Sequence, residues 1–267
     1  RENNPVAQHV LGSLYETGMG LEKNTAEAVA LHQKAADQGY VFSQHQLGQC
    51  FLHGTGVEQD LDKSIQWFSK AAEKGFVYML NQLGHRFLKG DGVEIDLKRA
   101  FQCFKKAAEQ GDTEAQYEVG ECYYFGDGIL QDFKQAAHWY TQAALQGHSD
   151  AQYEVGECYY YGNGILQNFK QAAHWYTQAA SRGHSDAQYA LARCCSLGKG
   201  VRQDHFRAFY WCHRSAQQGY SYAQLFIGKC CLQGLGTVKD ENQAHEWLKK
   251  AADQGLVDAQ AILHSLR

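Results

Sequence analysis

The pair Gly-x-Gly recurs at a constant spacing of 36 residues, and this period constrains the fold more than any other feature of the chain. The seven pairs begin at Gly18, Gly54, Gly90, Gly126, Gly162, Gly198 and Gly234. A fixed period is typical of a repeat array, in which each unit contacts only its neighbours. We therefore expect a long surface rather than an enclosed reaction chamber.

Composition narrows the function classes. The 267 residues carry a net charge of −4 and are 44% hydrophobic, which suffices for a continuous core and argues against a general attraction to nucleic acid. No apolar run is long enough to span a membrane. We expect a single domain over 1–267, a monomer and, because no signal peptide is visible, a cytoplasmic location. Export stays open, because the chain begins at Arg1 without an initiator methionine.

The repeat at 113–148 predicts a first helix, called helix A, that starts at Thr113. Thr113 and Gln116 form a capping-box pattern, in which the hydroxyl accepts from a free amide of the first turn and the glutamine reaches back. Apolar residues follow at helical spacings of three and four, namely Ala115, Val119, Cys122, Tyr123 and Gly126. Gly126 and Gly128 should end the helix, since glycine tolerates the left-handed conformation.

A second helix, called helix B, is predicted after each turn. It should begin at residues whose short side chains cap a helix well, which are Asn24, Asp60, Asp96, Asp132, Asn168, Asp204 and Asp240. In the fourth repeat its buried stripe comprises Ala136, Trp139, Tyr140, Ala143 and Ala144. The position of Ala144 is alanine in all seven repeats, which lets helices approach closely. Neither helix can cover its apolar stripe within one repeat, so we expect the repeats to stack.

These residues resemble the Sel-1-like repeat, a longer relative of the tetratricopeptide repeat. The matching string is Ala-Gln-x-x-Leu-Gly-x-x-Tyr-x-x-Gly-x-Gly, an Asp, then Ala-x-x-Trp-Tyr-x-x-Ala-Ala-x-x-Gly. The resemblance implies an all-α, right-handed α/α superhelix (solenoid) of seven 36-residue helix-turn-helix repeats plus a terminal helix at 257–267. The repeats fall at about 5–40, 41–76, 77–112, 113–148, 149–184, 185–220 and 221–256. It also implies an adaptor or scaffold without catalytic residues.

Three helix A positions per repeat, those of Tyr117, Glu121 and Tyr124, face away from the predicted core. In a stacked solenoid they should line the concave side. Exposed tyrosines offer a large contact area and a hydroxyl, as protein-binding surfaces require. We predict a site for a segment of a partner protein at Tyr117, Glu121, Tyr124, Tyr153, Glu157, Tyr160, Tyr189, Arg193 and Lys229. The alternative is that the rings stack on the next helix A and only cover backbone.

Charge and duplication add two weaker signals. The fourth repeat holds five acids and one base, whereas the sixth, at 185–220, holds five bases and two acids. Such a dipole can orient a charged partner, although a solvated face is the simpler alternative. Residues 114–149 and 150–185 differ at only six positions, which indicates an internal duplication.

The nine cysteines show no metal-knuckle spacing and are expected to be buried reduced thiols. Cys103 with Cys122, and Cys212 with Cys231, are each 19 residues apart, so disulfides and an oxidising compartment stay open. A cysteine-rich branch of the resembled family joins helices through cysteines at the positions of Ala144 and Gln152. That framework is absent from this sequence.

No catalytic constellation can be assembled from the sequence. The Gly-x-Gly turns follow helices and lack a Lys-Ser/Thr pair, so they are helix caps rather than phosphate loops. We expect no catalysis, no metal and no cofactor. Two alternatives belong to other classes: a structural spacer without its own ligand, and a hydrolase that uses a groove histidine such as His45 or His85.

Overall fold

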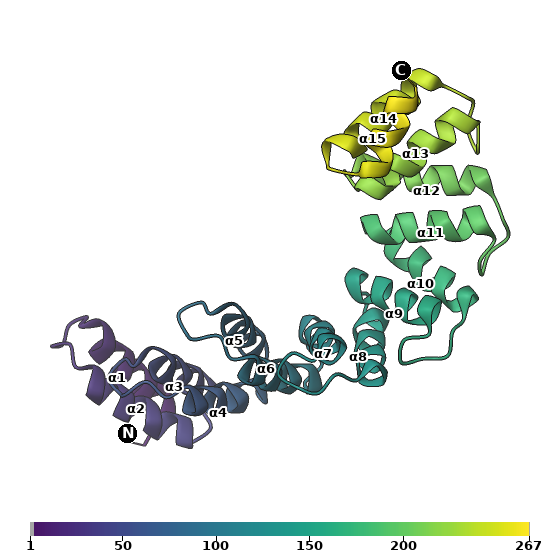
Figure 1. Ribbon diagram of the computed structural model, residues 1–267. Helices are drawn as coiled ribbons and strands as arrows, with labels where there is room; N and C mark the ends of the chain where they lie inside the picture. Colours follow the sequence, from purple (N-terminus) through teal and green to yellow (C-terminus); the bar gives the residue numbers. More distant parts are fainter. Residues whose placement is uncertain (1–2, 267) are drawn as a thin grey trace. The chain divides into compact units, whose positions relative to one another are not determined.

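The computed structural model describes residues 3–266, and these residues form fifteen α-helices and no strands (Figure 1). The helices are α1 (Pro5–Thr17), α2 (Thr25–Asp37), α3 (Val41–His53), α4 (Leu61–Ala72), α5 (Tyr78–Lys89), α6 (Leu97–Glu109), α7 (Thr113–Phe125), α8 (Phe133–Leu145), α9 (Ser149–Tyr161), α10 (Phe169–Ser181), α11 (Ser185–Leu197), α12 (His205–Gln217), α13 (Ser221–Gln233), α14 (Glu241–Asp253) and α15 (Val257–Ser265). The odd-numbered helices are helix A and the even-numbered ones are helix B. The predicted all-α repeat fold with a terminal helix is therefore confirmed.

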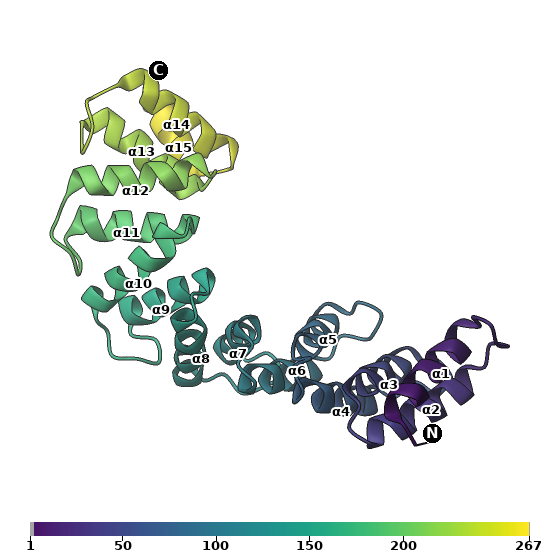
Figure 2. The same ribbon diagram turned by 180° about the vertical axis from the view of Figure 1, so that it is seen from behind.

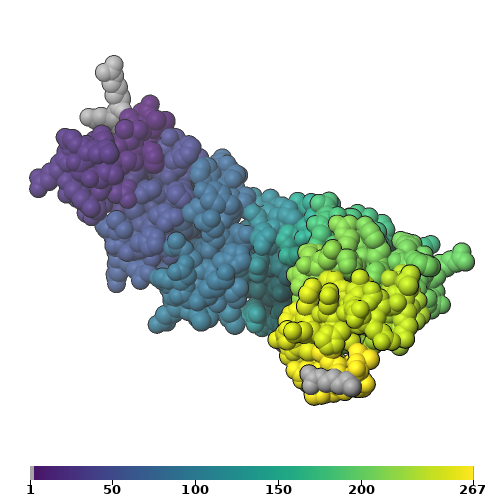
Figure 3. Space-filling model, turned by 90° about the horizontal axis from the view of Figure 1, so that it is seen from above, coloured from purple at the N-terminus to yellow at the C-terminus, as the bar shows by residue number. Residues whose placement is uncertain are grey.

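The chain divides into two compact units, one ending at Gln131 and the other beginning at Asp132. The first unit contains α1 to α7, and the second contains α8 to α15. Within each unit every helix packs against the next one along the chain, as two opposite views show (Figures 1 and 2). In the space-filling view the colours of each unit follow one another in sequence order (Figure 3). The division falls inside the fourth repeat, after its helix A. No helix in the described residues is long and apolar enough to cross a membrane.

The helix B starts are capped as predicted. All seven predicted Asp and Asn residues accept hydrogen bonds from backbone amides of the first turn, and Asp60 Oδ1, for example, accepts from Lys63 N at 2.9 Å. The second glycine of the Gly-x-Gly pair lies against backbone of the preceding helix B at Gly56, Gly128, Gly164, Gly200 and Gly236, whereas Gly20 and Gly92 have open space. A Cβ on Gly164 would collide with the carbonyl of Phe133 at the start of α8. This glycine therefore lets the turn of one repeat lie against the preceding helix B.

The predicted caps of helix A were wrong by one residue. Helix α7 begins at Thr113, but its N-cap is Asp112, whose side chain accepts from Ala115 N at 2.8 Å. At α9 the N-cap is His148, whose Nδ1 accepts from Ala151 N at 3.2 Å. The imidazole of His148 therefore takes the place of the Asp112 carboxylate as the acceptor. The hydroxyl residues Thr113 and Ser149, which were predicted as caps, are already the first residues of their helices.

The glutamine of the Ala-Gln pair also has a different partner from the one predicted. Gln152 does not reach back within its own helix, because its Nε2 donates to the carbonyl of Ala144 at 3.1 Å. The same bond to an alanine eight residues earlier is made by Gln44, Gln116, Gln188, Gln224 and Gln260. This hydrogen bond joins a helix A to the end of the preceding helix B.

The core pairs a small helix A residue with a larger helix B residue in most repeats. In several repeats a large helix B side chain lies against a helix A glycine, as Phe68 does against Gly48 and Tyr176 against Gly156. In the sixth repeat Ala192 takes the glycine position and Cys212 the large position, so the helix A residue gains a methyl group where the helix B side chain is smaller. The predicted stripes are confirmed at Ala115, Val119, Cys122, Ala136, Tyr140, Ala143 and Ala144, which are buried.

All nine cysteines are buried, as predicted, and the structure has each as a free thiol. The pairs Cys103 with Cys122 and Cys212 with Cys231 are not bridged. Burial raises the pKa of the Cys103 thiol to about 12, which suppresses the reactive thiolate near neutral pH. These thiols act as small apolar side chains of the core.

Candidate protein-binding surface

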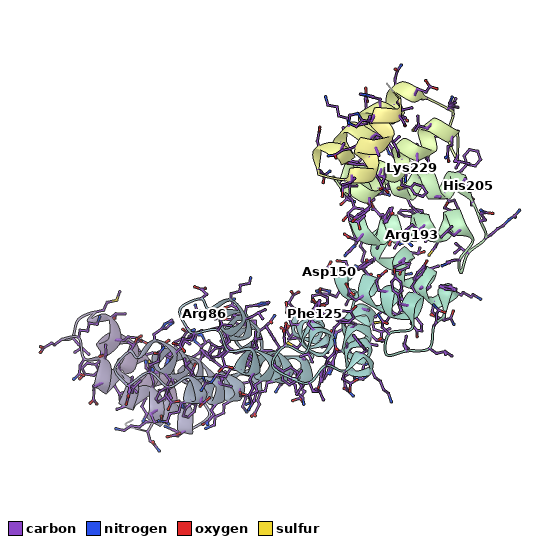
Figure 4. All side chains as sticks on the ribbon, viewed as in Figure 1. Arg86, Phe125, Asp150, Arg193, His205 and Lys229 are labelled. Atoms are coloured by element: carbon purple, nitrogen blue, oxygen red, sulfur yellow. The ribbon has the colours of Figure 1, made fainter. Side chains whose placement is uncertain are left out.

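The nine residues of the predicted surface are divided between the two units. Tyr117, Glu121 and Tyr124 lie on α7 of the first unit, whereas the other six lie on α9, α11 and α13 of the second. The ring of Tyr124 meets the ring of Phe125 edge to face at 5.0 Å, and Phe125 is exposed (Figure 4). Tyr117 and Glu121 are half-buried.

The expected ladder of exposed tyrosines was wrong at Tyr160, whose exposed fraction is 8%. Its ring packs edge to face against Phe169 at 5.2 Å, and two cations of the next repeat cover it. Phe169 belongs to α10, the helix B of the same repeat, whereas Arg193 and Lys199 belong to the next repeat. A helical wheel gives the direction of a side chain on its own helix, but not what the neighbouring elements place over it. Packing within the repeat and between repeats therefore buries this ring.

Tyr153 and Tyr189 are half-buried and pack on the N-cap residue of the following helix A. Tyr153 stacks on His184 with ring centroids 5.0 Å apart and an interplanar angle of 20°. Tyr189 lies 5.3 Å from the ring of Tyr220. His184 Nε2 also lies 3.2 Å from the carboxylate of Asp150. The alternative that these rings stack between repeats is thus supported, although part of each ring stays accessible.

Glu157 is held by the core rather than left free for a partner. Its Oε1 accepts a hydrogen bond from the hydroxyl of buried Tyr176 at 2.6 Å. Burial raises the pKa of Glu157, and the Tyr176 hydrogen bond and the charge of Arg193 partly oppose that rise. One carboxylate oxygen of Glu157 is therefore already occupied by a hydrogen bond within its own repeat.

Three cations lie along the same part of the second unit. The guanidinium of Arg193 is 6.0 Å from the ring of Tyr160 and 5.9 Å from that of Tyr189. Lys199 Nζ lies 4.9 Å from the Tyr160 ring centroid and 3.0 Å from its hydroxyl. Lys229 is exposed, one repeat further on (Figure 4). Sequence reasoning identified Arg193 and Lys229 but missed Lys199, because it lies in the turn after α11. We call these three residues the cationic strip.

A small pocket adjoins the cationic strip. It has a volume of about 160 Å³ and is lined by Ser196, His205, Ala208, Phe226, Lys229, Cys230, Gln233 and Leu235. Lys229 and His205 supply polar groups, while most of the remaining lining is apolar (Figure 4). Small-molecule sites usually measure about 300–1,000 Å³, so this pocket suits a single side chain better than a cofactor.

The histidines considered for hydrolysis occupy structural positions. His45 packs against the rings of Phe68 and Phe76, at 5.8 and 6.0 Å, and burial lowers its pKa. His85 meets Phe104 edge to face at 5.1 Å and lies 3.8 Å from Glu118 Oε1. A carboxylate partner that sequence reasoning missed therefore accompanies His85.

Paired helices repeated every 36 residues, with capped turns and helix A side chains arrayed from repeat to repeat, define an α-helical repeat protein. The sequence model of the Sel1 repeat matches residues 5–40, 41–76, 77–112, 113–148, 149–184, 185–220 and 221–256. The chain therefore belongs to the Sel1 repeat family. These boundaries coincide with the predicted ones, and proteins of such repeats generally mediate protein–protein interactions and are typically non-catalytic scaffolds.

Two solved structures are similar over almost the whole chain. A protective antigen of uropathogenic Escherichia coli with an SLR fold is 35% identical, with a TM-score of 0.73, covering 99% of this chain and 56% of that one. A Sel1 repeat protein from Oxalobacter formigenes is 34% identical, with a TM-score of 0.66, covering 99% of this chain and 77% of that one. The chain thus spans little more than half the length of the first. No curated protein matches the chain.

Proposed function

We propose that the chain is a non-catalytic adaptor that binds an acidic segment of another protein along the helix A surface of its second unit. The observation that carries this proposal is the cationic strip of Arg193, Lys199 and Lys229 beside a pocket for one side chain. We propose an acidic rather than a basic segment because the sixth repeat has five Lys and Arg residues against two acids. Complementary charge steers and orients a partner, while a buried anchor side chain supplies affinity.

The tyrosines have a supporting role in this proposal. Tyr160 and Tyr189 flank the Arg193 guanidinium, and Tyr160 also contacts Lys199. Contact with ring faces limits the rotamers of these cations, so less entropy is lost when a carboxylate binds them. In this proposal the partner contacts the cationic strip and the accessible parts of Tyr153 and Tyr189 directly.

The residues on α7 form a separate proposed contact area in the first unit. Tyr117, Glu121 and Tyr124 combine two half-buried rings with a carboxylate, and exposed Phe125 adjoins them. This combination favours apolar or basic side chains rather than acidic ones.

Selection from a displayed library of random peptides tests the proposal for the second unit. We expect enriched peptides to be acidic and to carry one apolar residue, and their affinity to fall as salt rises. The double variant Arg193→Glu, Lys229→Glu should weaken the best peptide at least about tenfold, equivalent to about 1.4 kcal/mol. Circular dichroism should show unchanged helicity.

The matched control reverses two exposed helix B lysines of the same unit, in the variant Lys134→Glu, Lys249→Glu. It makes the same change in net charge away from the cationic strip and should leave the affinity nearly unchanged. Equal losses in both double variants would mean that only net charge matters. Enrichment of basic peptides, or of none, would contradict the proposal.

A further inference from the structure

The first unit brings three potential metal ligands together on neighbouring helix A elements. His85 comes from α5, and Glu114 and Glu118 come from α7. One ligand atom from each residue lies within 4.8 Å of the other two. His85 Nε2 is 3.8 Å from Glu118 Oε1, with side-chain exposures of 31% and 16%. The cluster is therefore partly shielded from water and still open to an ion.

The local fold explains this arrangement. Residues four apart share one face of a helix, so Glu114 and Glu118 present both carboxylates on one side of α7. The His85 ring is held edge to face against Phe104 at 5.1 Å, which restricts its rotation. Two regular helices and a packed ring thus position the three side chains without a ligand, as a metal site requires.

The donor atoms of the cluster suit a cation. Glu114 and Glu118 supply carboxylate oxygens, and His85 supplies an imidazole nitrogen within 4.8 Å of them. Carboxylate and imidazole groups are common ligands of divalent metals.

A second observation concerns the far side of the His85 ring. His85 Nδ1 is buried without a hydrogen-bond partner, and so is Asn81 Oδ1, one helical turn earlier on α5. Histidines that bind a metal through one nitrogen usually donate the other N–H to an oxygen. Residues four apart on a helix are neighbours, so Asn81 is the acceptor that such a ligand would use.

We propose that His85, Glu114 and Glu118 bind one divalent transition-metal ion, with zinc as the best fit. One imidazole nitrogen and two carboxylate oxygens are a typical zinc donor set, and water would complete the tetrahedron. Ligand atoms at about 2.0–2.2 Å from zinc lie about 3.4 Å apart, so the side chains need to close slightly from their present positions. The ion would link the helix A elements of two successive repeats and stabilise the first unit.

Titration of the whole, tag-free chain with zinc chloride tests this inference. Isothermal calorimetry should show one saturable site, and the melting temperature should rise with zinc and fall back with EDTA. The variants His85→Ala and Glu118→Gln should each weaken zinc binding at least tenfold while circular dichroism stays that of the wild type. Cobalt should give a tetrahedral visible spectrum without thiolate charge-transfer bands.

The internal duplication provides a matched control. Glu154 occupies in the next repeat the position of Glu118, but there the position of His85 is occupied by Glu121. Glu154→Gln should therefore leave zinc binding unchanged. Thiolate bands with cobalt, equal binding by the His85 and Glu118 variants, or no saturable zinc binding would each overturn the inference. The outcome is independent of peptide binding, which concerns the second unit.

Discussion

The imidazole of His32 packs directly against Gly12, and its Cε1 lies 2.8 Å from where a Cβ on residue 12 would stand. Phenylalanine rings fill this position in the next two repeats, where Phe68 lies against Gly48 and Phe104 against Gly84. His32 is fully buried, and neither of its ring nitrogens has a hydrogen-bond partner, although Glu16 Oε2 lies 3.7 Å from Nε2. The first repeat therefore contains a polar ring at an apolar core position.

This packing predicts that the first repeat loses stability in acid. Burial, and then the charge of His9, lower the pKa of His32 from 6.5 to about 4. The folded state therefore favours the neutral ring. The contribution of His32 to the free energy of unfolding is complete above pH 6.5 and is lost as the pH falls towards 4. The loss should approach about 3 kcal/mol. Hydrogen exchange of α1 and α2 amides between pH 7 and 4 measures it.

The substitution His32→Phe should remove most of this pH dependence. It should also slow exchange in α1 and α2 at pH 7 by an amount equivalent to about 1–2 kcal/mol, because two buried nitrogens without partners disappear. Phe68→His is the reciprocal control and should make the second repeat acid-sensitive. Unchanged pH dependence in His32→Phe would mean that other groups, such as His9 and His45, control the transition.

The hydrogen bond between Gln152 and Ala144 should contribute measurably to stability. Gln152→Leu leaves the Ala144 carbonyl without this donor inside the stack, so we expect a loss of about 1–3 kcal/mol in the free energy of unfolding. Gln260 makes the equivalent bond to Ala252 but is exposed, so Gln260→Leu should cost less. Urea denaturation compares the two, and equal costs would show that burial does not decide the effect.

The glycines of the turns should differ sharply in their tolerance of alanine. Gly164 has a φ of +72° and no room for a Cβ beside the Phe133 carbonyl, whereas Gly183 has a φ of +97° and open space. Gly183→Ala should cost about 1–2 kcal/mol from its backbone conformation alone. Gly164→Ala should cost clearly more, because the repeats must also move apart. Melting temperatures of the two variants test this, and similar values would refute it.

The sixth repeat offers a test of volume compensation. Cys212→Phe alone should overpack the core against Ala192 and cost about 1–3 kcal/mol. Adding Ala192→Gly recreates the pair found at Phe68 and Gly48, so the double variant should recover part of that loss. A double-mutant cycle by urea denaturation should give a coupling free energy above about 0.5 kcal/mol. Additive effects would mean that the two side chains do not share this space.

Local signals explain why so much of the fold was predictable. Every helix B start depends on an Asp or Asn side chain bonded to amides two or three residues later, and such contacts can be read from sequence. The turn glycines likewise adopt positive φ wherever the period placed them. Each signal recurs in all seven repeats, so a coincidental match in one repeat could not change the predicted fold.

The sequence by itself determined the repeat, its helices, their caps at helix B and the positions of the core stripes, since all of these depend on contacts within about one helical turn. Only the tertiary structure decided that Tyr160 is covered, that Gln152 bonds to the preceding helix, and that His85 meets Glu118. Each of these depends on which side chains the neighbouring helix brings close, and a helical period specifies directions on one helix but not distances between two.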